Sequence, residues 1–223
     1  MKKNAPLFVF DCDGTLELPV VFAYAQEKQK NKDMTMTLAE FKAAHPDEKK
    51  LMISGMADFI KYASEIGNVV LLSGGDPVAE GSKELKSLFP LFQKWEIEGK
   101  EVPFGREPTG LLKNTPEVAQ GLRDYFNPSK VVVIGDSTAE CELAKNIKAD
   151  VLLVRGASEG LYQGLDTVPH KHTFQFGKEI IPVVQEDLKH QRRHRTYPRV
   201  QPRRPYIYPK NHSRIRRKSS EKA

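Results

Sequence analysis

The chain of 223 residues has room for one sizeable α/β domain and a remainder, and only 39% of its residues are hydrophobic, which indicates that part of it does not join a core. Its two cysteines, Cys12 and Cys141, are too few for a disulfide framework and favour a reducing cytosol. No stretch approaches the roughly 20 apolar residues of a membrane span. We therefore expect a cytoplasmic protein that does not act in the membrane.

The net charge of +6 is distributed unevenly along the chain. Residues 189–223 contain 13 of the 35 Lys and Arg residues but only one of the 29 acidic residues, Glu221. The preceding residues are therefore acidic on balance, whereas the C-terminal segment is strongly basic.

Short apolar runs recur along the chain, and segments with helical periodicity separate them. The runs predict strands at residues 8–10, 69–72, 131–134 and 151–154, with a further short strand near 95–97. Helices are expected at residues 56–66, 77–88, 115–126, 139–147 and 178–190. Strands that alternate with helices in this way predict an α/β fold with a parallel, doubly wound sheet.

Residues 16–54 interrupt this alternation directly after the first strand. The segment is short and mostly polar, and Thr37 with Glu40 fits a capping box that opens a helix ending near Ala44. We expect a small helical insert here, within a domain that extends from residue 1 to residue 190.

Polar side chains follow three of the expected strands. Asp11 and Asp13 come after the first, Ser73 after the second and Asp136 after the third. The carboxyl ends of parallel strands meet at one edge of the sheet, which is where such sheets bind ligands. Because burying two carboxylates is costly without a cation or a proton, we expect a bound Mg²⁺ at this edge.

These residue types suit the hydrolysis of a phosphate monoester. Asp11 is placed to attack phosphorus and form an aspartyl phosphate, and Asp13 can protonate the leaving oxygen and later deprotonate water. Mg²⁺ prefers oxygen ligands, so Asp11, the backbone carbonyl of Asp13 and Asp136 would suit it.

Three further groups are expected to bind the phosphate. Ser73 and the amide of Gly74 offer hydrogen-bond donors to a phosphate oxygen. Lys113, near the N-terminus of the helix expected at residues 115–126, offers a positive charge, for which Lys100 and Arg106 are nearby alternatives.

The same residues resemble the four motifs of the haloacid dehalogenase superfamily phosphatases, over about residues 6–157. The first motif of that family, Asp-x-Asp-Gly-Thr, is similar to Asp11-Cys12-Asp13-Gly14-Thr15. The later motifs resemble, in order, Leu71-Leu72-Ser73-Gly74, then Lys113 with Pro116-Glu117, and then Gly135-Asp136-Ser137-Thr138-Ala139-Glu140. The resemblance implies a Rossmann-like core, Mg²⁺ and phosphoryl transfer to water through an aspartyl phosphate. The second aspartate favours a phosphatase over a dehalogenase.

The resemblance is incomplete at one position and leaves the substrate open. The last acidic position is Glu140 where the family has Asp, so Glu140 is a weaker candidate as a metal ligand, reaching the ion through water. Members of the family select substrates with a cap domain, and the insert at about residues 16–54 would be a small cap. A small cap implies an open site, as in enzymes that oligomerise or act on large substrates; the phosphorylated substrate and the oligomeric state are not identified.

The basic segment at residues 191–223 has no helical or strand period, and four prolines fall between Pro198 and Pro209. We expect a disordered tail. Its arginines and tyrosines could bind nucleic acid through phosphates and base stacking, or the tail could be a solvated extension, a contact for an acidic surface or a localisation signal. A nucleic-acid-binding protein with an idle phosphatase site, or a phosphatase acting on nucleic-acid ends, are therefore the alternatives to a general phosphatase.

Overall fold

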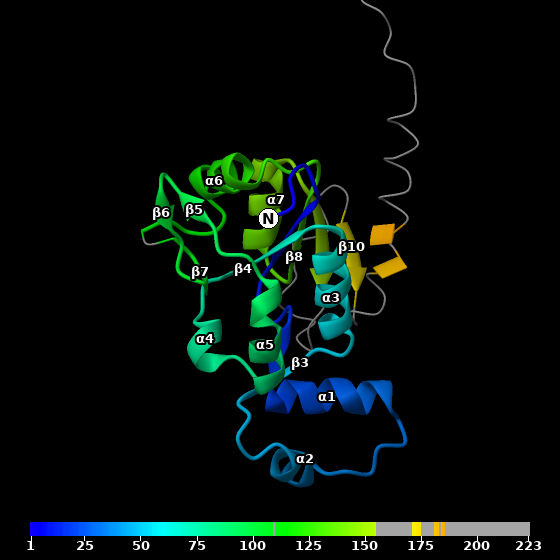
Figure 1. Cartoon of the computed structure of the whole chain (residues 1–223). Coiled ribbons are helices and arrows are strands. Elements are labelled where there is room, and N and C mark those ends of the chain that lie inside the picture. The colour runs from blue at the N-terminus through cyan, green and yellow to red at the C-terminus, as the bar shows by residue number, and fades with distance from the viewer. Residues whose placement is uncertain (109, 155–170, 175–180, 183, 186–223) are drawn as a thin grey trace, which may run out of the picture.

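A six-stranded parallel sheet forms the centre of the structure, a computed structural model that describes residues 1–108, 110–154, 171–174, 181–182 and 184–185 (Figure 1). The strands lie in the spatial order β10 (Lys171–Phe174), β9 (Asp150–Val154), β8 (Val131–Gly135), β1 (Leu7–Phe10), β4 (Asn68–Ser73) and β7 (Gly105–Arg106). Counted along the chain, this is the order 6-5-4-1-2-3, which is the Rossmann order read from the other edge. The direction of winding changes between β1 and β8, so a ligand site is expected beyond the ends of these two strands.

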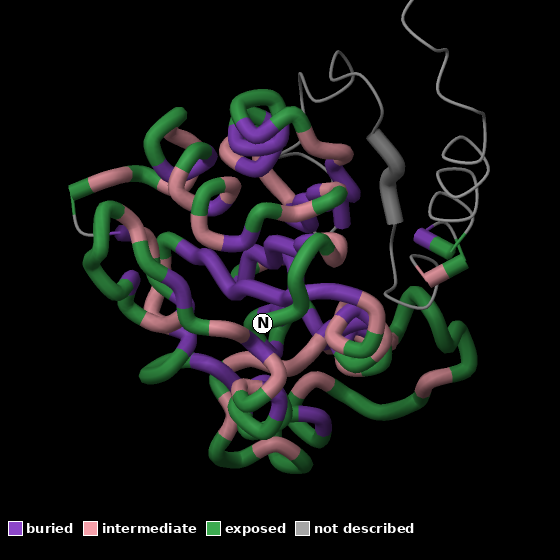
Figure 2. The backbone as a smooth tube through the Cα atoms, turned by 45° about the horizontal axis from the view of Figure 1, so that its top comes forward, coloured by how far each residue is buried: buried purple, intermediate pink, exposed green. Residues whose placement is uncertain are grey.

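Alternate residues of the central strands enter two different cores. Phe8 and Phe10 of β1 pack on the face covered by α3 and α5, whereas Leu7 and Val9 pack on the face covered by α6 and α7. β1, β4 and β8 are buried along their whole length, and the buried segments gather in the middle of the molecule (Figure 2). The predicted doubly wound α/β sheet is confirmed, because both faces of the sheet are covered and all of its strand pairs are parallel.

The helices of this core follow the strands with one departure from expectation. They are α3 (Met56–Ile66), α4 (Pro77–Glu80), α5 (Lys83–Leu88) followed by the 3₁₀ turn η1 (Phe89–Leu91), α6 (Pro116–Phe126) and α7 (Thr138–Ile147). The single helix expected at residues 77–88 is wrong, because Gly81 and Ser82 divide it. The Ser82 amide donates to Glu17 Oε1 (2.8 Å) instead of continuing the helix, and its hydroxyl caps α5 by accepting from the Leu85 amide (3.1 Å).

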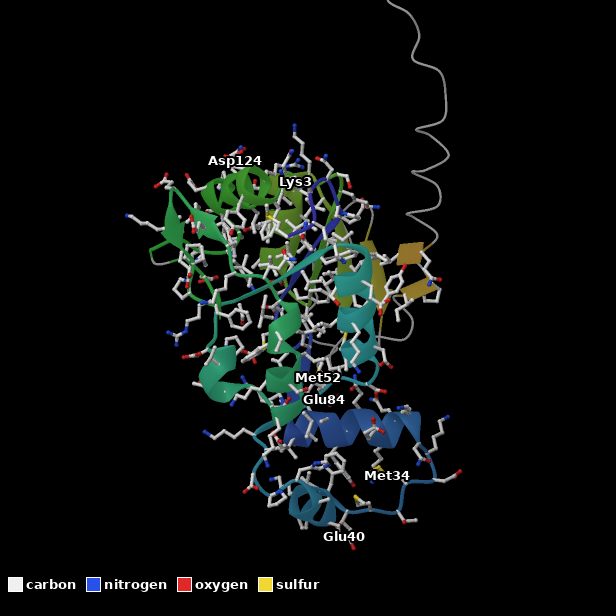
Figure 3. All side chains as sticks on the ribbon, viewed as in Figure 1. Lys3, Met34, Glu40, Met52, Glu84 and Asp124 are labelled. Atoms are coloured by element: carbon white, nitrogen blue, oxygen red, sulfur yellow. The ribbon has the colours of Figure 1, made fainter. Side chains whose placement is uncertain are left out.

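The insert after β1 contains two helices held on a two-stranded stem. Its elements are β2 (Glu17–Pro19), α1 (Val20–Lys30), α2 (Leu38–Ala44) and β3 (Lys50–Met52), with β2 and β3 antiparallel. Thr37 and Glu40 form the expected capping box. The insert lies beyond the carboxyl ends of β1 and β4 (Figure 1). Met34 and Glu40 accordingly lie at the opposite end of the molecule from Lys3 and Asp124 (Figure 3).

The sequence patterns predicted the long central strands but missed most of the others. β5 (Glu96–Ile97) falls where a short strand was expected, whereas its partner β6 (Lys100–Glu101) and β2, β3, β7 and β10 were not predicted. Of the helix expected at residues 178–190, the described residues 181–182 and 184–185 are helical, and the rest lies outside the described residues, as does the tail at 191–223. In the described part of the chain, no helix combines the length and apolar composition needed to cross a bilayer. A cytoplasmic location stays a prediction.

Candidate active site

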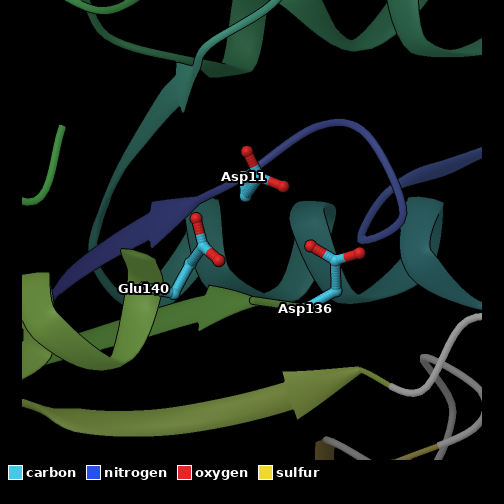
Figure 4. A group of neighbouring side chains, drawn as sticks. All are labelled: Asp11, Asp136 and Glu140. Atoms are coloured by element: carbon cyan, nitrogen blue, oxygen red, sulfur yellow. The ribbon is translucent and has the colours of Figure 1, made fainter. Parts of the chain in front are cut away.

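Three carboxylates converge where the winding of the sheet changes direction. Asp11 follows β1, Asp136 follows β8 and Glu140 lies in the first turn of α7, and each offers an oxygen within 4.8 Å of the other two (Figure 4). The Asp11 amide donates to the Ile134 carbonyl of β8 (2.9 Å), so strand pairing continues through Asp11 and fixes its backbone. The pairing of β1 with β8 therefore sets the distance between the two aspartates.

Lys113 supplies the positive charge of this group. Its Nζ lies 2.7 Å from Asp11 Oδ1 and also contacts Glu140 Oε1. Burial alone would lower the pKa of Lys113, but Asp11 and Glu140 raise it well above its usual value, so the side chain stays a cation. Lys113 precedes α6, and its amide donates to Glu107 Oε1 (3.1 Å), which holds the loop. The position expected from the sequence is therefore the one that reaches Asp11.

Burial makes the two aspartates difficult to ionise together. It raises the pKa of Asp11 to about 6, against the opposing effect of Lys113. It raises the pKa of Asp136 to about 7, with further contributions from Asp11 and Glu140. One lysine thus leaves negative charge uncompensated. A group of carboxylate oxygens that repel one another in this way fits a hard divalent cation, which prefers oxygen ligands.

Glu140 is not the ordinary surface acid that its position on a helix would suggest. Its side chain is buried, and its Oε2 accepts hydrogen bonds from the Ser137 amide (2.9 Å) and hydroxyl (2.5 Å) in a capping box that begins α7. Its Oε1 lies against the ammonium group of Lys113. Both oxygens are already engaged, so Glu140 is better placed to hold Lys113 and the helix end than to act as a primary metal ligand.

Gly14 leaves room for the Asp136 carboxylate because it has no side chain. It has φ of +79°, and a Cβ atom at this residue would lie 1.9 Å from Asp136 Oδ2. The loop after Asp13 therefore passes directly over the Asp136 carboxylate, which a side chain at residue 14 would displace.

Ser73 and Gly74 lie at the end of β4, beside β1. Ser73 is buried, and its hydroxyl oxygen accepts from the Gly75 amide (3.2 Å), which leaves the hydroxyl hydrogen available for another acceptor. Gly74 is exposed. Asp13 Oδ2 lies 2.7 Å from where a Cβ atom of Gly75 would be, so the Asp13 carboxylate lies over this same loop.

Asp13 is not one of the three grouped carboxylates, and its side chain contacts a residue of the insert. Its Oδ1 accepts a hydrogen bond from Lys50 Nζ at 2.6 Å, and Lys50 also contacts Glu80 Oε2 of α4 at 3.3 Å. Sequence reasoning missed Lys50. It stands beside Lys49 in a polar segment, and no local pattern distinguishes the two lysines.

Cys12, between the two aspartates, is a buried thiol and not a half-cystine. Burial and the neighbouring Glu17 raise its pKa well above the usual value, so it is not poised as a thiolate.

Comparison with known proteins bears on the fold. No protein-family model and no curated protein matches the sequence. Solved structures do match: a haloacid dehalogenase-like family hydrolase from Xanthomonas campestris superposes with a TM-score of 0.53 at 15% identity, covering 86% of this chain and 100% of that one. A candidate β-phosphoglucomutase from Thermotoga maritima gives 0.52 at 19% identity, covering 81% of this chain and 99% of its own.

A third structure, a candidate phosphatase from Clostridium difficile, gives a TM-score of 0.51 at 14% identity and covers 82% of this chain and 99% of its own. At these identities the likeness is one of fold. It confirms, at the level of fold, the resemblance predicted from the four motifs. The chain has the Rossmann-like α/β fold of the haloacid dehalogenase-like hydrolases.

Proposed function

We propose that this protein is a Mg²⁺-dependent phosphatase that hydrolyses a phosphate monoester through an aspartyl phosphate on Asp11. The observation that carries the proposal is the position of Asp11 at the end of β1, 2.7 Å from Lys113 Nζ and within 4.8 Å of the oxygens of Asp136 and Glu140. A carboxylate in this setting has a cation on one side and, on the other, the Asp136 carboxylate that could share a metal ion with it. The fold of the structural neighbours supports the same reaction class.

Asp11 and Asp136 would hold the ion, with the Asp13 carbonyl as the third protein ligand expected from the sequence. When bound, Mg²⁺ supplies positive charge that offsets the two carboxylates and the phosphate. Ser73 and Lys113 bind the transferred phosphoryl group, the first as a hydroxyl donor and the second as a cation.

The first chemical step joins Asp11 to phosphorus. An Asp11 carboxylate oxygen forms the new P–O bond, the ester P–O bond breaks, and Asp13 gives its proton to the departing oxygen. The products are an alcohol and the phosphorylated Asp11. Asp13 is left as a carboxylate on the leaving-group side of the site.

The second step returns the enzyme to its starting state. The Asp13 carboxylate takes a proton from a water molecule, whose oxygen attacks phosphorus while the bond to Asp11 breaks. Inorganic phosphate leaves and Asp13 again carries a proton. The two aspartates thus divide the work: Asp11 exchanges the bond to phosphorus and Asp13 moves the proton.

The test uses 4-nitrophenyl phosphate, with Mg²⁺ and with EDTA. We expect Asp11→Asn to lower kcat by roughly 10³-fold or more, since the reaction loses its nucleophile. Asp58→Asn is a matched control, because Asp58 is an exposed aspartate of α3 whose contact is the surface residue Lys61. Substantial turnover by a folded Asp11→Asn variant would refute the assignment of the nucleophile.

The basic segment at residues 191–223 keeps a second function open as a proposal, resting on its sequence. If this segment binds RNA or DNA through about 6–10 phosphates, affinity should fall by roughly 10³–10⁵ between 50 and 200 mM salt. A panel of 3′- and 5′-phosphorylated oligonucleotides, assayed with the full chain and with residues 191–223 removed, separates an end-specific phosphatase from a binding protein.

A further inference from the structure

The insert meets the core along a seam of charged contacts. Four residues of the insert contact three residues of the core. Lys50 contacts Glu80, and Glu17 accepts from the Ser82 amide. Asp47 and Glu48 contact the side chain and the amide of Lys83, respectively. Met52 of β3 and Glu84 of α5 lie at the junction between the two parts (Figure 3). The seam follows the segment that connects the Ser73 loop to α5, so the insert rests directly beside the catalytic loops.

The β2–β3 stem turns one face toward the core. Directly opposed residues of antiparallel strands share a face, and the register pairs Glu17 with Met52 and Pro19 with Lys50. Glu17 and Lys50 therefore project from the same side of the stem. The buried Glu17 accepts from the Ser82 amide (2.8 Å), which anchors this face against the start of α5.

Because the stem is anchored on this face, the side chain of Lys50 reaches Asp13. Its side chain is only 16% exposed, and its Nζ lies 2.6 Å from Asp13 Oδ1. That contact leaves Oδ2 as the second Asp13 oxygen, lying against Gly75 in the loop that carries Ser73. Oδ2 is thus the oxygen that faces the phosphate-binding side and is able to carry the transferred proton.

We propose that Lys50 is a positioning residue, which holds Asp13 by Oδ1 so that Oδ2 faces the leaving oxygen, and which does so while the insert is seated on the core. The inference rests on the proposed phosphatase function and deepens it. It makes proton transfer by Asp13 dependent on a residue of the insert, whereas bond formation by Asp11 depends on core residues alone.

The experiment compares leaving groups of one shape and different basicity: 4-nitrophenyl, phenyl and 4-methoxyphenyl phosphates. 4-Nitrophenolate leaves as a stable anion, whereas the more basic phenolates need a proton from Asp13. We expect Lys50→Met to reduce kcat/KM for 4-methoxyphenyl phosphate about tenfold more than for 4-nitrophenyl phosphate, a part of the roughly 10²–10⁴-fold that acid–base catalysis contributes, because Asp13 itself is still present. Lys50→Arg, which keeps a cation, should restore much of the difference.

Two controls separate positioning from a structural effect. Lys83→Met removes another lysine of the seam, which contacts Asp47 at 3.4 Å and does not contact Asp13 in the described structure, and it should keep the wild-type dependence on leaving group. In an Asp13→Asn background, Lys50→Met should have no further effect on this dependence, because Lys50 acts through Asp13. Urea unfolding of each variant establishes that it is folded.

The outcomes are distinct. Absence of aryl phosphate hydrolysis by the wild type overturns the proposed function and this inference together. Hydrolysis by the wild type, with an equal loss for all three substrates in Lys50→Met, overturns the inference alone, as does an undiminished effect of Lys50→Met in the Asp13→Asn background.

Discussion

The candidate site contains two lysine–carboxylate clusters that differ in origin. The core cluster joins Lys113 to Asp11 and Glu140, all from loops and helices that follow the strands of the sheet. The seam cluster joins Lys50 of the insert to Asp13 and Glu80. In both clusters a lysine lies within hydrogen-bond distance of one of the two motif aspartates, Asp11 or Asp13.

The two clusters differ in how far their side chains are exposed to solvent. Lys113, Asp11 and Glu140 have side chains 12%, 6% and 2% exposed, whereas in the seam cluster Lys50 is 16% exposed but its partners Asp13 and Glu80 are 48% and 55% exposed. Removing one partner of a buried pair strands a charge, while an exposed pair contributes little to stability. The core cluster should therefore govern folding as well as catalysis, and the seam cluster should govern catalysis with little effect on folding.

Lys113→Met should have the largest effect on stability, because it removes the cation of the core cluster. The variant leaves Asp11 and Glu140 buried without their cation, so we expect a loss of about 3–5 kcal/mol in the free energy of unfolding at pH 8 without Mg²⁺. The loss should shrink at pH 5, where Asp11 can be protonated. Urea unfolding measures both values.

The matched comparison is Lys50→Met, for which we expect a loss of no more than about 1 kcal/mol under the same conditions. Equal losses in the two variants would show that burial does not distinguish the clusters.

Sequence reasoning reached the core cluster because its signals are local. The apolar runs placed Asp11, Ser73 and Asp136 at strand ends, and parallel pairing then required those ends to meet. Glu140 was expected as a weak metal ligand, although the spacing of Ser137 and Glu140 matches the capping box that the structure contains.

The seam cluster could not be predicted in this way. β2 and β3 are three residues each, too short to produce a period, and they are defined by pairing with each other across the whole insert. The break at Gly81 and Ser82, hidden in an apparently continuous helix, depends on Glu17 from 65 residues away. Such contacts between polar residues far apart in the sequence determine the position of the Lys50 side chain.

The effect of Mg²⁺ on the stability of the core cluster should be somewhat smaller than the effect of Lys113→Met. The raised pKa values of Asp11 (about 6) and Asp136 (about 7) mean that, between about pH 4 and 7, the metal-free native state holds protons that the unfolded chain has lost. Its stability from these groups therefore falls as the pH rises through that window.

If Mg²⁺ binds as proposed, it replaces those protons, so its stabilising effect should be small at pH 5 and full at pH 8. At a hundredfold excess over Kd the gain is about 2.7 kcal/mol, or roughly 5–10 °C in Tm for a chain of this size. Thermal unfolding with Mg²⁺ or EDTA measures it, with Asp136→Asn as the control that should lose the effect. A shift in Tm of equal size at both pH values would contradict the assignment of these carboxylates.

The smallest expected effect is that of Glu80→Gln, which tests how the seam cluster is built. Glu80 is more than half exposed and lies farther from Lys50 Nζ (3.3 Å) than Asp13 does (2.6 Å), so it contributes little to holding the lysine. We expect a change of less than about 1 kcal/mol in the free energy of unfolding and an almost unchanged dependence of kcat/KM on leaving group. Should Glu80→Gln instead match Lys50→Met on 4-methoxyphenyl phosphate, Lys50 would have to be held by Glu80 rather than by the buried anchor at Glu17. Proton transfer would then depend on α4 of the core as much as on the insert.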